Sequence, residues 1–240
     1  MTSTIATVIG LALLLGVSSP SQGETIVGAG SQAASPEHQS LTAPRDLIAV
    51  WSQQPDLAEG GWHASFLRLS DGQGAECADD IQLPYTATIT AIEWWGAYGP
   101  PADLQYLLLR IYQDGGSGTP GSLHSQKSIY TFTGEQVAGG SGSDYRYSAD
   151  LDSHFTPVAG TTYWLSIWGV EQTGEWFWYE CIPGDHWGNE AAFRSDYLGY
   201  SDWVPWSDYG SGHAEFAFVL YADPTTVEPT TWGTIKALYR

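Results

Sequence analysis

The segment ITAIEWWGAY, residues 89–98, decides the fold, because it places two tryptophans side by side in an apolar, strand-like run. Successive side chains of a β-strand point to opposite faces of its sheet. Only one of Trp94 and Trp95 can therefore lie in a core on one side of that sheet. The alternation assigns Ile92 and Trp94 to the inner face, and it assigns Ile89, Glu93 and Trp95 to the outer face.

The outward Trp95 has two alternative roles. On an open face, Trp95 beside Glu93 would belong to a ligand platform. Beneath a loop such as residues 183–210, it would pack in a satellite core. Long loops commonly cover small apolar clusters, which favours the second role.

Similar short runs recur along the chain, rich in Trp, Tyr, Ile, Val and Thr and separated by Gly, Asp and Pro. In residues 106–112, Leu107, Leu109 and Ile111 share one face of the predicted strand. In residues 163–168, the side chains at 163, 165 and 167 lie on one face, and those at 164, 166 and 168 lie on the other. No sustained helical period precedes the last ten residues. The sequence predicts an all-β chain, an antiparallel β-sandwich of jelly-roll type in a single domain.

Four segments divide the chain. Residues 1–23 have the apolar run and small residues of a secretory signal peptide, although no Lys or Arg precedes the run, so that an uncleaved anchor is the alternative. Residues 24–46 predict a flexible leader, and residues 47–223 predict the sandwich domain. Residues 224–240 predict either a sorting or attachment segment, similar to the Trp- and Lys-containing tails of exported bacterial proteins, or a loosely docked tail. We expect a secreted protein, extracellular or on the cell surface, with no membrane span in the mature chain.

The net charge of the chain restricts the kinds of partner that it can bind. The chain has 27 Asp and Glu against 8 Lys and Arg, a net charge of −19. Such a field repels nucleic acid and anionic lipid, so we expect no nucleic-acid partner. It favours cations or a neutral partner such as a polysaccharide or glycan.

The two cysteines, Cys77 and Cys181, predict a disulfide, because an exported chain with an even cysteine count usually pairs its thiols. Two unpaired buried thiols are the alternative.

Five segments carry a resemblance to a group of secreted bacterial β-sandwich domains of unknown function. They are WSQQPD (51–56), CADDIQLPYTATITAIEWWGAYG (77–99), LRIYQDGGSGTPGSL (109–123), FTPVAGTTYWLSI (155–167) and EFAFVLY (215–221). The group has ADDF, ITxIxWWGxY, IRIYxDxxGxPG, AGTxYWLSI and LAFxLY strands in this order. The resemblance implies a fold and a location but no catalytic residues. Because its pattern does not require Cys77, the predicted disulfide rests on composition alone.

Carbohydrate binding is the most specific function that the sequence predicts. Sugars pack their C–H faces on aromatic rings while Asp, Asn or Glu side chains bond their hydroxyls. The irregular segment 183–210 supplies both residue types, and packing is the alternative role for its aromatics. The candidate ligand-binding residues are Glu93, Trp95, Asp185, Trp187, Asn189, Asp202, Trp203, Trp206, Asp208 and Tyr209.

Acidic residues at strand and loop ends suggest one structural calcium ion, since Ca²⁺ takes oxygen ligands, although none has the spacing of a calcium-binding loop. These candidate metal ligands are Asp79, Asp80, Asp114, Asp150 and Asp152.

We expect no enzymatic activity and no other cofactor, because no nucleophile or metal motif appears. The favoured function is an exported, non-catalytic binding or display module, with carbohydrate at the cell surface as the favoured ligand. A structural surface or matrix protein is the first alternative. A glycoside hydrolase or lyase is the second, with carboxylates drawn from Glu93, Glu175, Glu180 and Glu190.

Overall fold

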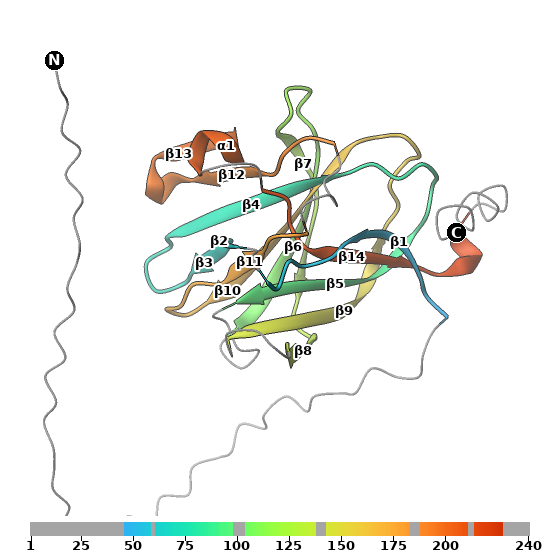
Figure 1. Ribbon diagram of the computed structural model, residues 1–240, viewed down its shortest axis with the longest axis horizontal. Coiled ribbons are helices and arrows are strands. Elements are labelled where there is room, and N and C mark those ends of the chain that lie inside the picture. Colours follow the sequence, from blue (N-terminus) through green and yellow to red (C-terminus); the bar gives the residue numbers. More distant parts are fainter. Residues whose placement is uncertain are drawn as a thin grey trace, which may run out of the picture. The chain divides into compact units, whose positions relative to one another are not determined.

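The computed structural model describes residues 46–58, 61–97, 104–137, 143–182, 188–210 and 214–227, which belong to one compact unit (Figure 1). The predicted signal peptide, nearly all of the leader and most of the tail lie outside the described residues. Within the described part of the chain, no helix is long and apolar enough to cross a membrane.

Two seven-stranded sheets make up the fold, and the expected all-β class is confirmed. In the first sheet, β14 and β11 both pair with one edge of β5, β9 pairs with the other edge, and β1, β2 and β8 flank them. Its strands are β1 (Ile48–Gln53), β2 (Trp62–Ala64), β5 (Ile89–Ala97), β8 (Thr133–Gln136), β9 (Asp144–Phe155), β11 (Phe177–Tyr179) and β14 (Phe218–Ala222).

The second sheet has the order β13-β12-β4-β3-β10-β6-β7. Its strands are β3 (Phe66–Arg68), β4 (Gly74–Ile81), β6 (Leu104–Asp114), β7 (Pro120–Ile129), β10 (Tyr163–Glu171), β12 (Ala192–Ser195) and β13 (Tyr200–Pro205). Three short helical turns accompany the sheets: η1 (Asp196–Leu198), α1 (Trp206–Tyr209) and η2 (Pro224–Thr226).

The main core lies between the sheets, and strict alternation along the strands builds it. Leu107, Leu109 and Ile111 of β6 enter this core, as do Tyr163, Leu165 and Ile167 of β10, so the predicted faces of both strands are confirmed. The intervening side chains of β10, which include Trp164 and Trp168, point to the outer face of the second sheet.

The tryptophan pair of β5 divides between two clusters. Trp94 is buried in the main core, where its ring stacks on Tyr147 at 5.5 Å between centroids. Trp95 is 6% exposed and packs on the outer face of the first sheet with Tyr179, Val219 and their neighbours. We call this second group the satellite cluster.

One side-chain direction in β5 differs from the prediction. Ile89 lies in the main core and not on the outer face. Against β14, β5 has one extra residue between Ile89 and Ala91, and such a bulge reverses the alternation that a regular strand would give.

The predicted disulfide is wrong for this structure, since no bond joins the two cysteines, both of which are described. Cys77 lies in the main core, where its thiol donates to the carbonyl of Ala64, whereas Cys181 belongs to the satellite cluster. The first sheet separates the two sulfurs, so the alternative of two buried thiols holds.

Short strand β3 determines the shape of the second sheet. β4 and β10 pair directly at one end, through Asp79 to Ile81 and Tyr163 to Leu165. At the other end β3 inserts between them, antiparallel to β4 and parallel to β10. The two strands therefore diverge, and the outer face opens where they do.

Candidate functional site

A cleft of about 580 Å³ lies where β4 and β10 diverge, and we call it the outer cleft. It draws on β3, β4, β10, β12 and η1. The residues that line it include Gln73, Glu76, Trp168, Arg194, Asp196 and Tyr197.

Glu76 is the hydrogen-bonding centre of the outer cleft. Its carboxylate is buried, and Oε2 accepts from Arg110 at 2.9 Å and from Arg194 at 2.6 Å. Oε1 accepts from the Tyr112 hydroxyl at 2.8 Å and from Ser166 at 2.9 Å. Two of the eight basic residues of the chain thus converge on one carboxylate, and such charge-assisted bonds hold the side chains in fixed positions.

Both arginines also contact tryptophan rings. The Arg110 guanidinium lies 4.3 Å from the ring centroid of Trp168, and that of Arg194 lies 4.5 Å from the ring of Trp203. Tyr112 completes the group, and burial together with the Glu76 carboxylate raises its pKa, so that its hydroxyl stays protonated. Trp168, Trp203 and Tyr112 therefore each have a charged neighbour.

Trp168 is positioned by the start of β4. Its indole N–H donates to the carbonyl of Ala75 at 2.7 Å, and its ring passes directly over Gly74. A Cβ at Gly74 would lie 2.9 Å from the Trp168 ring and 2.6 Å from the carbonyl oxygen of Phe66, so only glycine leaves this space. The aromatic wall of the cleft is therefore formed before any ligand arrives.

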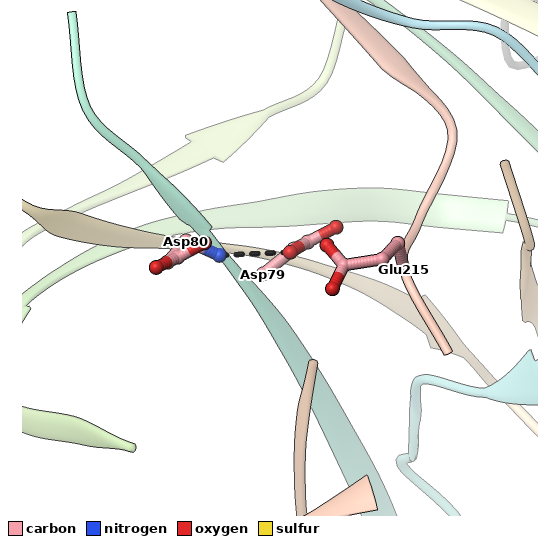
Figure 2. Close-up of side chains that lie close together, drawn as sticks. All are labelled: Asp79, Asp80 and Glu215. Carbon is pink, nitrogen blue, oxygen red and sulfur yellow. Dashed lines mark hydrogen bonds between the residues drawn. The ribbon is translucent and has the colours of Figure 1, made fainter. Parts of the chain in front are cut away.

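A second polar group lies at the other end of β4. Asp79, Asp80 and Glu215 each offer a carboxylate oxygen, and these oxygens lie within 4.8 Å of one another. We call them the acidic cluster. Figure 2 shows the carboxyl groups of Asp79 and Glu215 turned toward each other, while Asp80 leaves β4 on the opposite side, as the alternation of a strand requires.

Asp79 and Glu215 connect the two sheets. Asp79 Oδ2 accepts from the backbone N–H of Phe216 at 2.6 Å and from the Gln53 amide at 3.2 Å, and that amide also donates to Glu215 at 3.4 Å. Burial raises the pKa of both carboxyls, and the charge of Asp79 raises that of Glu215 further.

Asp80 is buried on the outer side. Its Oδ2 accepts from the backbone and side-chain N–H groups of Asn189, at 3.1 and 2.8 Å, and the backbone of Gly188 packs against the carboxylate. Its Oδ1 is buried and has no hydrogen-bond partner among the described residues. Burial raises the pKa of Asp80, and the charge of Asp114 adds to this effect.

A family model for a domain of unknown function, DUF7901, matches residues 49–221. The chain belongs to the DUF7901 family. No curated protein and no solved structure matches it.

The DUF7901 domain distributes the predicted carbohydrate residues over several environments. Trp203 lies on the outer face of the second sheet, edge-on to Tyr112. Trp206 is buried in the main core, and Tyr209 stacks on Phe193 at 3.8 Å. Asn189 bonds to Asp80, and Asp202 and Asp208 are exposed. Asp185 and Trp187 lie outside the described residues.

Glu93 and Trp95 both lie on the outer face of the first sheet. Trp95 is packed in the satellite cluster, the role that the sequence favours for it. Glu93 is half-buried, with its carboxylate 4.0 Å from Arg146. The side chain of Trp95 is therefore not presented on the surface.

The predicted metal ligands separate into two groups. Asp79 and Asp80 come together in the acidic cluster, and Asp114, which accepts from the Trp164 indole at 3.2 Å, lies near Asp80. Asp150 and Asp152 lie on β9 of the first sheet, where exposed Asp152 pairs with Lys127 at 3.5 Å.

Sequence patterns predicted Asp79 and Asp80 of the acidic cluster, but not Glu215 or the principal residues of the outer cleft. Arg110 and Trp168 had a usable signal, because each is the outward residue of a strand whose inward positions are apolar. No sequence pattern of comparable strength pointed to Glu76 or Arg194. Glu215 lies 215 − 79 = 136 positions from Asp79, and no local pattern connects residues so far apart.

Proposed function

We propose that the DUF7901 domain is an exported, non-catalytic binding module of jelly-roll type that holds carbohydrate in its outer cleft. The observation that carries this proposal is the preformed wall of Trp168, fixed by Ala75 and Arg110 beside the hydrogen-bonding groups around Glu76.

The chemistry of the cleft suits a sugar. Trp168 and the exposed Tyr197 supply aromatic surface for the C–H face of a pyranose ring, and Tyr197 is 53% exposed. Gln73, Arg194 and Asp196 supply donors and acceptors for hydroxyl groups. A volume of about 580 Å³ falls within the range of small-molecule sites.

The fixed side chains of the outer cleft also support carbohydrate binding. Arg194 is tied to Glu76 and Tyr112, and the Ser195 hydroxyl donates to the carbonyl of Gly74 at 2.6 Å. A site whose side chains are already ordered loses little conformational entropy on binding. The net charge of −19 favours neutral over acidic glycans.

The jelly-roll topology and the cell-surface location belong to the same proposal. The chain passes from one sheet to the other at most of its connections, for example from β4 to β5 to β6 and from β9 to β10 to β11. This alternation supports a jelly-roll sandwich. The predicted signal peptide supports export.

The structure gives the hydrolase alternative no added support, because its four candidate glutamates bond to different groups. Glu93 lies beside Arg146, and Glu175 bonds to Arg68. Glu180 bonds to His63, and Glu190 accepts from Ser207.

The proposal is tested by screening the purified chain on a glycan array and by pull-down with insoluble polysaccharides. We expect at least one glycan to bind and Trp168→Ala or Tyr197→Ala to weaken that binding at least about tenfold in calorimetry. Trp62→Ala is the matched control, since Trp62 is 39% exposed on β2 of the first sheet, away from the cleft residues. Blank arrays and pull-downs would favour the structural surface protein. Equal losses in all three variants would contradict the placement of the site.

A further inference from the structure

We propose that the acidic cluster of Asp79, Asp80 and Glu215 binds one calcium ion, which joins the two sheets of the DUF7901 domain. The ion would connect β4 of the second sheet to the segment that leads into β14 of the first (Figure 2). The proposal stands apart from carbohydrate binding in the outer cleft.

The spacing of the oxygens suits calcium. Ca²⁺ binds oxygen at about 2.4 Å, so two ligands on opposite sides of one ion lie up to about 4.8 Å apart. An oxygen of each of the three carboxylates lies within 4.8 Å of the others, so small side-chain movements would bring all three to one ion. All three residues are at most 4% exposed, and none is a histidine or cysteine, which favours a hard cation over zinc.

Asp80 gives an independent indication of a missing ligand. It is 4% exposed, and its Oδ1 is buried without a hydrogen-bond partner among the described residues. Buried carboxylate oxygens are almost always satisfied, because leaving one unpaired is costly. A cation held by this carboxylate would supply the partner that Oδ1 lacks.

The charges around the acidic cluster also favour a bound cation. Asp79 and Asp80 are adjacent and buried, and neither forms an ion pair with a Lys, Arg or His side chain within the described residues. The basic residues nearest along the second sheet, Arg110 and Arg194, are bound to Glu76 instead. A divalent ion would neutralise these buried carboxylates.

A cavity beside Glu215, which Asp79 and Asp80 do not line, has room for water ligands of the ion. Glu215 lines a cavity of about 530 Å³ together with Gly188, Asn189 and Glu190. Ca²⁺ takes six to eight ligands, more than three carboxylates supply unless they bind through both oxygens. Water in this cavity can complete the coordination without any change in the sheets.

The test measures whether calcium stabilises the fold. The full chain is freed of metal with chelator, and its thermal unfolding is followed with and without CaCl₂ at fixed pH and ionic strength, with MgCl₂ in parallel. At a hundredfold excess over the dissociation constant we expect Ca²⁺ to raise Tm by about 5 to 10 °C. Tb³⁺, excited through tryptophan, should luminesce on binding, and Ca²⁺ should displace it.

Two conservative variants and one control locate the ion. Glu215→Gln and Asp80→Asn keep the size and most hydrogen bonds of each side chain, and we expect both to lose the Ca²⁺ shift and at least about tenfold in Tb³⁺ affinity. Asp152→Asn, which removes a fully exposed carboxylate on β9, should keep both responses. A wild-type chain with neither response, or a Glu215→Gln variant that keeps the wild-type responses, would overturn the proposal. A glycan screen with and without Ca²⁺ tests binding in the outer cleft separately from binding of the ion.

Discussion

The two outer faces of the sandwich each carry outward tryptophans, yet their surroundings differ. On the first sheet, Trp95 is buried among Ala97, Tyr179 and Val219, although Arg146 lies opposite it on β9. On the second sheet, Trp168 lies against Arg110 and lines a cleft that contains Glu76. An outward tryptophan therefore does not by itself indicate a binding site. A ring that lines a cleft, as Trp168 does, differs in this from a ring that is packed over in a satellite core, as Trp95 is.

The largest expected effect comes from the centre of the polar face. Glu76→Ala leaves Arg110 and Arg194 without their shared acceptor in a largely buried position, and removing one partner of such a pair costs about 3 to 5 kcal/mol. We expect this loss in the free energy of unfolding, measured with urea. Glu93→Ala is the matched control on the first sheet, because half-buried Glu93 forms a looser ion pair with Arg146, at 4.0 Å, and its loss should cost less than about 1 kcal/mol. Equal costs would mean that the two faces do not differ in this respect.

A slightly smaller effect is expected on the apolar face. Trp95→Ala opens a cavity in the satellite cluster and should cost about 3 kcal/mol, the lower end of the range for buried tryptophan, because the cluster is small. Glycan affinity of the folded variant should equal that of the wild type, in contrast to Trp168→Ala. A Trp95→Ala variant that unfolds as readily as the wild type but loses glycan binding would move the site to the first sheet.

Local periodicity predicted much of the fold, because the direction of a side chain depends on its position in a strand. The faces of β6 and β10 and the division of Trp94 from Trp95 followed from alternation alone. The bulge at Ile89 was not predictable in this way, because it depends on how β5 pairs with its neighbours.

The candidate sites were less predictable, because they also depend on how distant strands pair and pack. Glu215 meets Asp79 only through the packing of two sheets, and Cys77 and Cys181 are kept apart by the first of those sheets. Composition suggested a cation and a disulfide, but register and sheet packing determine which side chains come together. The sequence therefore supplied Asp79 and Asp80 as metal ligands without the residue that completes their cluster.

The smallest expected change in stability tests the shape of the polar face. Gly74→Ala places a methyl group 2.9 Å from the Trp168 ring and 2.6 Å from the carbonyl of Phe66, so the ring or the β3–β4 pairing must shift. Overpacking of this kind costs about 1 to 3 kcal/mol. Because Trp168 lines the outer cleft, glycan affinity should fall while the Ca²⁺ response of the distant acidic cluster is retained. Gly160→Ala is the control outside the cleft, since a Cβ there meets no atom within 4 Å although its φ is +69°. If Gly74→Ala and Gly160→Ala weakened glycan binding equally, the position of the Trp168 ring would not govern recognition, and the contrast between the two faces would rest on Glu76 and its arginines alone.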